Sequence, residues 1–351
     1  MVNTFQIGHR TIGPGQPCFI IAEAGVNHNG DLNLARQLVE TAAKAGADAV
    51  KFQTFVAERL VTADAPQAEY QSRNTGVTES QLSMLQRLEL SESAHLELKT
   101  LCDELGILFL STPFDELCAD FLSNLGIAAF KIPSGEITNT PFIAHVARKG
   151  LPMILSTGMA TLAEIRDAVD AVRATGNLDF ALLQCVSAYP SKPEQTNLRA
   201  MRTLADAFNV PSGYSDHSEG IEIALAAVAL RACIIEKHFT IDRSLPGPDH
   251  KASLEPSELS AMVAGIRKVE LALGDGEKIP SVEELPTAAV ARKSLVASRD
   301  LKAGEVFDFS MAVARRPGTG LPPSVLGSLL GRKLARDLAK NEVLSFANFV
   351  D

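Results

Sequence analysis

Two lysines and two histidines stand within or at the ends of short apolar runs, where side chains are normally buried. Lys51 lies in AVKFQT and Lys131 in AAFKIPSGE, while His217 ends SGYSDH and His238 ends CIIEKH. A buried ammonium group needs an anionic partner, which a small phosphorylated or carboxylated substrate would supply. A single lysine in such a run more often extends to solvent. Two lysines at matching positions, with hydroxyl side chains nearby, favour an anion site.

The hydroxyl side chains follow the same runs and could bind the remaining oxygens of an anion. They are Thr112, Ser134, Ser156 and Ser215. Each one alone is weak evidence, because serine is common in turns. Carboxylates occur in similar places, at Glu23, Glu136 and Asp249. An enclosed carboxylate can transfer a proton or accept a hydrogen bond from a hydroxyl, and an ion pair with Lys51 or Lys131 is the alternative role.

The two histidines could bind one divalent cation if their runs form neighbouring strands. Such strands lie roughly 4.8 Å apart, and metal–imidazole bonds are about 2.1 Å long. Without a thiolate, this ligand set favours Mn²⁺ or Mg²⁺, with water and substrate oxygen in the other positions. Asp216 and Glu236 are expected to be further ligands or partners of the ligands. Two hydrogen-bonded histidines without a metal are the alternative.

Eight apolar runs that end in polar residues alternate with segments of helical periodicity. The runs are 19–23, 49–54, 107–112, 128–136, 152–158, 181–189, 212–217 and 233–238. The helical segments are 32–46, 92–105, 115–125, 141–149, 161–174, 196–208, 220–230 and 256–273. This order predicts an α/β protein with a (β/α)8 TIM barrel, which buries its strands on both faces and collects its active site at their carboxyl ends. An open doubly wound sheet would usually carry a GxGxxG turn, which is absent.

Strand periodicity then divides the side chains between the inside and the outside of the barrel. Alternate residues face opposite sides, so the polar residues at the strand ends should all face inward. These are Glu23, Lys51, Gln53, Thr112, Lys131, Ser156, Ser187, Tyr189, Ser215, His217, Glu236 and His238. Their neighbours should face the helices, namely Val50, Phe52, Phe109, Phe130, Ile132, Leu155 and Ile235.

Length and composition limit the remaining possibilities. A chain of 351 residues exceeds one barrel, so we expect a barrel with a short N-terminal extension at 1–273, a linker at 274–287 and a small domain at 288–351. The net charge of −9 argues against nucleic-acid binding. Five cysteines without CxxC spacing indicate reduced thiols. No signal peptide or membrane span is expected, so a soluble, cytoplasmic protein is predicted.

The strand-end motifs together resemble the sialic acid synthase family. They are AEAGVNHNG, KFQT, LSTPFD, FKIPSGE, LSTGM, YSDHS, EKHFT and PGPDH, in that order. The last segment, with RRPGTG, resembles the family's antifreeze-like SAF domain. The resemblance implies condensation of phosphoenolpyruvate with an N-acetylated hexosamine to a nine-carbon 2-keto-3-deoxy acid and phosphate. The segment 73–91 is similar to the neuraminate and legionaminate branch, because the pseudaminate branch typically has tryptophan there and this chain has none.

The same resemblance implies a role for each matching residue. Phosphoenolpyruvate would be held by Lys51, Thr112, Lys131, Ser134, Ser156 and Ser215, and the divalent metal by His217 and His238. The sugar would contact Gln53, Asn74, Tyr189, Glu136 and Asp249, with Glu23 near the reacting carbons. Arg316 would reach the N-acetyl group from the other subunit of a domain-swapped homodimer. The family often has asparagine where Ser187 stands, so this chain departs from the pattern at one phosphoenolpyruvate contact.

Two other functions fit parts of the pattern. A metal-dependent sugar aldolase or hydrolase on the same barrel would not need phosphoenolpyruvate. A carbohydrate- or ice-binding protein could combine a degenerate barrel with the small domain, although the intact lysines, histidines and carboxylates favour an enzyme. The sequence leaves open whether the sugar is N-acetylmannosamine or its 2,4-diacetamido-2,4,6-trideoxy counterpart.

Overall fold

The computed structural model describes residues 2–77 and 79–350, which form two compact units, 1–274 and 275–351. The first unit contains eight parallel strands in the order β5-β4-β3-β10-β9-β8-β7-β6. Their bounds are Phe19–Gly25 (β3), Ala49–Thr54 (β4), Leu108–Pro113 (β5), Phe130–Ile132 (β6), Met153–Ser156 (β7), Phe180–Cys185 (β8), Ser212–Asp216 (β9) and Ile234–His238 (β10). Among the described residues, β5 and β6 are adjacent without a hydrogen-bonded ladder, so the predicted barrel is confirmed and nearly closed.

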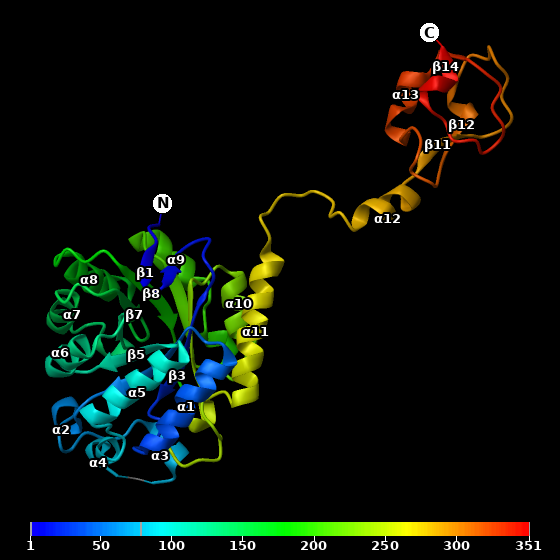
Figure 1. Cartoon of the computed structure of the whole chain (residues 1–351). Coiled ribbons are helices and arrows are strands. Elements are labelled where there is room, and N and C mark those ends of the chain that lie inside the picture. The colour runs from blue at the N-terminus through cyan, green and yellow to red at the C-terminus, as the bar shows by residue number, and fades with distance from the viewer. Residues whose placement is uncertain (1, 78, 351) are drawn as a thin grey trace. The chain divides into compact units, whose positions relative to one another are not determined.

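Helices follow the strands and surround them in Figure 1. They are Leu32–Ala45 (α1), Glu92–Leu105 (α5), Glu116–Leu125 (α6), Thr140–Ala147 (α7), Leu162–Arg173 (α8), Ala200–Phe208 (α9), Glu222–Ala229 (α10) and Pro256–Leu273 (α11). The helix α1 shows why the sequence signals were informative. Asp31 accepts hydrogen bonds from the N–H groups of Asn33 and Leu34, and Gly46 ends the helix at φ 80°.

Two strands are shorter than their apolar runs. The strand β6 stops at Ile132 because Pro133 has no N–H for the ladder, and Ser134–Glu136 forms a 3₁₀ turn instead. The strand β8 ends at Cys185, so Ser187 and Tyr189 lie on the loop beyond it. Short strands bring these residues to the loop layer above the barrel, where active sites of this fold are built.

The predicted division between inward and outward side chains is confirmed by the packing. The residues expected to face outward all belong to the core that the strands share with the helices. A separate apolar cluster fills the amino-terminal part of the barrel interior, with Ile21, Leu110 and Ile154 among its members. The hairpin of β1 (Phe5–Ile7) and β2 (Arg10–Ile12) adds Phe5, Ile7 and Ile12 to this cluster. The sequence indicated only a short extension here, and the hairpin closes the end of the barrel opposite to the strands' carboxyl ends.

Between β4 and α5 the chain forms three short helices, Ala57–Leu60 (α2), Glu69–Thr75 (α3) and Gln81–Gln86 (α4). They pack on a small apolar cluster that includes Phe55, Met84 and Leu88. All five cysteines are buried and free, in agreement with the prediction of reduced thiols. No described helix is both long enough and apolar enough to span a membrane.

The second unit has its own core of Leu295, Phe307, Leu334 and other apolar residues. It contains the helices Glu284–Ala291 (α12) and Leu326–Leu329 (α13), and the strands Ser294–Ala297 (β11), Ala312–Arg315 (β12), Lys333–Leu334 (β13) and Phe349–Val350 (β14). The strands pair in two antiparallel ladders, β11 with β12 and β13 with β14. The helix α12 occupies the end of the segment expected to be a linker.

Candidate active site

Lys51 and Lys131 meet inside the barrel with two carboxylates, Glu23 and Glu236; we call these four residues the lysine–carboxylate cluster. Lys51 Nζ lies 2.8 Å from Glu23 Oε2 and 3.8 Å from Glu236 Oε2, and Lys131 Nζ lies 3.5 Å from Glu236 Oε1. All four side chains are at least nine-tenths buried. The two ammonium groups, from β4 and β6, therefore approach the same carboxylate, Glu236, which lies between them.

Hydroxyl side chains complete the hydrogen bonding of this cluster. Lys51 donates to Thr112 Oγ1 at 2.9 Å, and Lys131 donates to Ser156 Oγ at 2.7 Å. Ser215 Oγ donates to Glu236 Oε1 at 3.0 Å. The three hydroxyls come from β5, β7 and β9, so side chains far apart in the sequence are assembled by the barrel alone.

The pKa values of the two carboxylates in the cluster are shifted in opposite directions. Burial raises the pKa of Glu23 to about 7, although the nearby Lys51 opposes this effect. Burial also disfavours the charge of Glu236, but Lys131 and Lys51 outweigh it and hold the pKa of Glu236 at about 2. Burial lowers the pKa of Lys131, whereas for Lys51 the effect of burial is exceeded by Glu23 and Glu236, which raise its pKa. At neutral pH Glu236 is a carboxylate, and Glu23 is poised to gain or lose a proton.

Ser134 and Ser187 converge on Gly158, which follows the end of β7. The Gly158 N–H donates to Ser134 Oγ at 3.0 Å. A Cβ at this glycine would lie 2.5 Å from Ser187 Oγ and 2.8 Å from Ser134 Oγ. Both hydroxyls thus occupy the space that any larger residue would need, and a glycine is required here for close approach rather than for its backbone angles.

His217 and His238 lie side by side at the ends of β9 and β10, with ring centroids 5.5 Å apart. His217 Nδ1 donates to Val186 O at 2.7 Å. His238 Nδ1 is buried and has no hydrogen-bond partner among the described residues. Burial, together with His217 and Lys51, holds the pKa of His238 well below its usual value, so its imidazole is neutral. Burial disfavours the charged form of His217, but Cys185 and the Val186 carbonyl outweigh it and raise the pKa of His217, so this ring must lose a proton before it can bind a divalent cation.

These two histidines could supply two ligands to a metal ion, but not a complete coordination shell. No group of three or more His, Cys, Asp or Glu side chains within the described ranges is arranged to hold an ion. Water and substrate would have to supply the remaining ligands, which is the geometry of an open catalytic site. Asp216, expected as a ligand or partner of the ligands, instead bonds Lys237 and Ser218. Being an outward residue of β9, it cannot reach the ion.

Aromatic and loop residues surround the histidine pair. The ring of Tyr189 stacks on His217 with centroids 4.1 Å apart and meets His238 edge-on at 5.7 Å. Asn74 Nδ2, from α3, donates to Pro248 O at 2.7 Å, which brings α3 to the loop that carries Asp249. Asp249 is buried, its pKa is raised to about 6 by that burial, and its Oδ1 has no partner within the described parts of the chain.

Two further predicted site residues of the first unit, Gln53 and Glu136, form no described hydrogen bond or ion pair with the cluster, and a third, Arg316, belongs to the second unit. Gln53 lies on β4 two residues beyond Lys51 and pairs across the ladder with Thr112. Glu136, on the 3₁₀ turn after β6, accepts a hydrogen bond from Asn139 at 2.8 Å and forms no ion pair with either lysine. Arg316 belongs to the second unit, where it is exposed and its Nε donates to Ala291 O at 3.0 Å.

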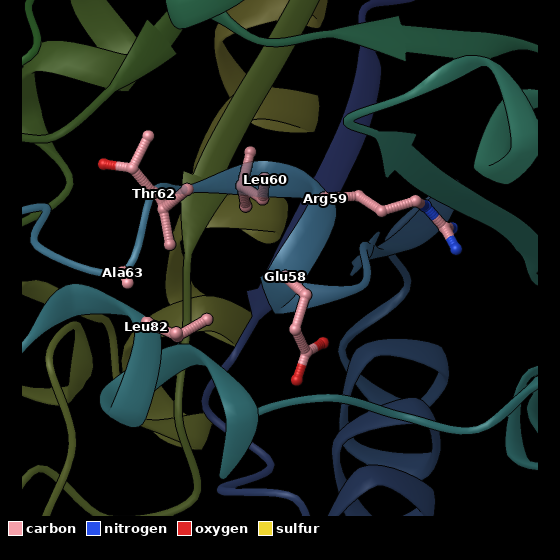
Figure 2. Close-up of a pocket in the computed structure, with 7 residues that line it drawn as sticks. Glu58, Arg59, Leu60, Thr62, Ala63 and Leu82 are labelled. Atoms are coloured by element: carbon pink, nitrogen blue, oxygen red, sulfur yellow. The ribbon is translucent and has the colours of Figure 1, made fainter.

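A pocket of about 470 Å³ lies elsewhere on the first unit and contains none of the predicted site residues. Figure 2 shows its lining on α2 and the loop after it, with Leu82 from α4. Its only charged lining residues are Glu58 and Arg59, and Arg59 is paired with Asp115 at 2.8 Å. It lacks the convergent hydroxyl and ammonium groups that the barrel interior provides.

The sequence analysis assigned no role to Lys237 and expected Glu236 to be a metal ligand or a partner of the metal ligands, whereas Glu236 lies between the two lysines. Lys237 escaped notice because it is an outward residue of β10, where an apolar side chain is the normal choice. Its position between two inward residues, Glu236 and His238, was the available signal. The role of Glu236 as the anion between both lysines depends on distances across three strands, which no local pattern reveals.

The barrel and its interior define a class: an enzyme that binds a small anion at the carboxyl ends of the strands, joined to a small β domain. The model of the NeuB family matches residues 38–278, and the SAF domain model matches residues 292–350. The chain therefore belongs to the NeuB family, whose members condense phosphoenolpyruvate to form nonulosonic acids and typically use a divalent metal. The resemblance seen in the sequence is confirmed.

Individual relatives agree with this assignment. The chain is 50% identical over 341 residues to N,N'-diacetyllegionaminic acid synthase from Legionella pneumophila, covering 96% of each chain. It is 48% identical to the enzyme of the same name from Campylobacter jejuni, covering 93% of this chain and 98% of the other. Among solved structures, N-acetylneuraminic acid synthetase from Leptospira borgpetersenii is 39% identical with a TM-score of 0.73, covering 82% of this chain and 95% of the other.

Proposed function

We propose that this synthase joins phosphoenolpyruvate to a 2,4-diacetamido-2,4,6-trideoxy hexose, giving an N,N'-diacetyllegionaminate-type acid, and that N-acetylmannosamine is the poorer substrate. The support for the sugar is the 50% and 48% identity to two proteins named N,N'-diacetyllegionaminic acid synthase. The single observation that carries the reaction is the lysine–carboxylate cluster, in which two buried ammonium groups converge inside the barrel on one carboxylate, Glu236.

Phosphoenolpyruvate is held by Lys51 and Lys131 together with nearby hydroxyls. The ammonium groups are already desolvated and fixed by Thr112 and Ser156, so little reorganisation is needed when the anion binds. Ser134, Ser187 and Ser215 donate to the remaining phosphate or carboxylate oxygens. Glu236, held ionised between the lysines, keeps both of them protonated while the site is empty.

The sugar binds above this anion, against Tyr189, Asn74 and Asp249, with Gln53 and Glu136 at the edge of the site. Tyr189 lies against both histidine rings, and Asn74 bonds to the loop that carries Asp249, which supports a sugar aldehyde near His217 and His238. C3 of phosphoenolpyruvate then attacks the aldehyde carbon, forming the new C–C bond. The aldehyde oxygen becomes a hydroxyl by taking up the proton that Glu23 receives from the water that adds to C2.

Positive charge develops at C2 when C3 forms its bond. The Glu23 carboxylate, 2.8 Å from Lys51, stabilises that charge and accepts a proton from the water that adds to C2. The bond between C2 and the phosphate oxygen of the resulting tetrahedral intermediate then breaks, and the C2 hydroxyl passes its proton to the departing phosphate, which leaves the 2-keto acid. Lys51 and Lys131 meet the charge of the departing phosphate.

His217 and His238 would hold the divalent cation, Mn²⁺ or Mg²⁺, through ring nitrogens that the protein leaves free. When bound, the cation supplies a Lewis acid for the aldehyde oxygen. Calorimetric titration of Mn²⁺ tests the site, because a His217→Ala/His238→Ala variant should lose the binding while keeping its affinity for phosphoenolpyruvate. Unchanged Mn²⁺ affinity in that variant would place the metal elsewhere.

The active assembly is a homodimer in which Arg316 of one subunit covers the barrel of the other. The first residues of the second unit expose several apolar side chains, among them Ile279, Val282 and Leu285, which a second copy would cover. Arg316 uses its Nε on Ala291 O. The rest of its guanidinium can donate to the carbonyl oxygen of an acetamido group.

The proposed substrate is tested by a competition between the two sugars. Equal amounts of N-acetylmannosamine and its 2,4-diacetamido-2,4,6-trideoxy counterpart are supplied with limiting phosphoenolpyruvate and Mn²⁺, and the nine-carbon products are separated by mass. We expect the diacetamido product to dominate. A dominant neuraminate product would overturn the sugar assignment, and phosphate release without either product would overturn the condensation.

A further inference from the structure

A second buried ion pair lies on the opposite side of the two strands that carry the histidines. Lys237 Nζ is 2.7 Å from Asp216 Oδ2, and both side chains are fully buried. The two residues are partners across the ladder between β9 and β10. Each directly adjoins one histidine, because Asp216 precedes His217 and Lys237 precedes His238.

The same pair also fixes the turn that follows β9. Asp216 Oδ1 accepts hydrogen bonds from Ser218 N at 2.9 Å and from Ser218 Oγ at 2.6 Å. Lys237 donates a further bond to Ser218 O at 2.7 Å. The residues on both sides of His217 are therefore tied to β10 by two charge-assisted hydrogen bonds from Lys237. The His217 backbone is held relative to His238 before any ligand arrives.

Stability alone is a weak reason for this arrangement. Taking two charges out of water is costly, and apolar residues of similar size often replace a buried ion pair without loss of stability. Burial indeed lowers the pKa of Lys237, with Asp216 opposing it. An outward position on a barrel strand normally carries an apolar residue. What the pair adds beyond packing is a directional link between two strand ends.

We infer that Asp216 and Lys237 are positioning residues, which set the separation of the His217 and His238 rings and hence the affinity for a divalent cation. His238 depends on them most, since its Nδ1 has no hydrogen-bond partner among the described residues. His217 is oriented by Val186 O and by Tyr189. The inference rests on the proposed metal site, and it adds the residues that hold the two histidines in position.

The test compares Mn²⁺ binding with phosphoenolpyruvate binding. In the double variant Asp216→Asn/Lys237→Met, both charges are removed together, so that no unpaired charge remains buried. Free Mn²⁺ is counted by electron paramagnetic resonance, and phosphoenolpyruvate is titrated calorimetrically without metal. We expect Mn²⁺ affinity to fall about 10- to 100-fold, with phosphoenolpyruvate affinity within about twofold of the parent. A purely structural role would leave both affinities unchanged, or weaken both together, and either result overturns the inference.

Ser218→Ala provides a milder variant if the double variant does not fold. It removes only the bond from Ser218 Oγ to Asp216, and we expect Mn²⁺ affinity to fall roughly two- to tenfold; unchanged affinity would overturn the inference. Arg267→Met is the matched control, since it removes an ion pair with Asp48 at the amino-terminal end of the strands and should leave Mn²⁺ affinity unchanged. If the parent protein itself binds no Mn²⁺, the metal site of the proposed function fails first.

Discussion

The two ends of the barrel interior are filled by opposite kinds of side chain. At the amino-terminal end, the β1–β2 hairpin inserts Phe5, Ile7 and Ile12 among apolar strand residues. A few residues further along the same strands, the interior holds the lysine–carboxylate cluster, whose members are equally buried but charged. The two regions differ in chemistry and not in exposure. Burial alone therefore does not distinguish the stabilising end from the reactive end.

The difference follows from what each end must do. Apolar burial contributes about 25 cal/mol per Å² and needs no partner, so the closed end can stabilise the barrel on its own. Buried charges cost free energy unless they are paired, and we propose that at the open end the pairing is shared with a substrate. Substitutions at the two ends should consequently separate stability from activity.

The largest expected effect is the loss of a lysine. Lys51→Ala and Lys131→Ala each remove a cation that faces the anion, so kcat/KM for phosphoenolpyruvate should fall at least about 10³-fold. Steady-state titration of both substrates measures this. Lys149→Ala is the matched control, because Lys149 pairs with Asp120 on the outside of the barrel. A change confined to the KM of the sugar would contradict the anion site.

The next effect concerns Glu23 and pH. Because its pKa is raised to about 7, Glu23 is largely neutral below pH 7 and ionised above it. The proposed role needs the carboxylate, so kcat should rise about tenfold from pH 6 to pH 8 in phosphoenolpyruvate-saturated enzyme. Glu23→Gln should lower kcat and remove this rise. If the variant retained the same pH limb, another group would be titrating.

A smaller effect tests the proposed exchange of domains between subunits. Lys131→Ala chains and Arg316→Ala chains should each be nearly inactive. When mixed and allowed to exchange subunits, half of the dimers are mixed and each has one complete site, so activity should recover to about a quarter of the parent. Exchange is verified with differently tagged chains. Absence of recovery after verified exchange would mean that the small domain does not cover its partner's barrel.

The smallest effect on activity is expected at the closed end. Ile12→Ala leaves a cavity in the apolar cluster and should lower the free energy of unfolding by about 2–5 kcal/mol. Phosphoenolpyruvate affinity and kcat should stay within about twofold of the parent. Urea unfolding and steady-state kinetics give the two values. A loss of activity in proportion to the loss of stability would show that the two ends are not independent.

Much of the fold could be predicted from the sequence because its signals are local. The helices α5 and α11 have the bounds that their periodicity predicts. Strand alternation separated Lys51 from Phe52 correctly, and it predicted which residues would gather at the carboxyl ends. The hairpin β1–β2 was missed because its strands have only three residues each, which is too short for alternation to be recognised.

The sequence predicted which residues belong to the candidate site better than it predicted the contacts between them. Residue type and the alternation of side chains along each strand predicted that Lys51, Lys131 and Thr112 would lie together, since all three face inward near the carboxyl ends of their strands. Which carboxylate lies between the lysines depends on register between strands, so Glu236 was not foreseen in that place. Glu136 bonds Asn139 because Pro133 ends β6 and the chain turns away.

Calorimetric titration of phosphoenolpyruvate tests the central claim most directly. The parent protein, Lys131→Ala and Ile12→Ala are compared at the same pH and ionic strength. We predict that Ile12→Ala binds phosphoenolpyruvate as tightly as the parent does, while Lys131→Ala shows an affinity weaker by about 10²-fold or more. Equal binding by Lys131→Ala and the parent would contradict the assignment of the charged end of the barrel as the phosphoenolpyruvate site.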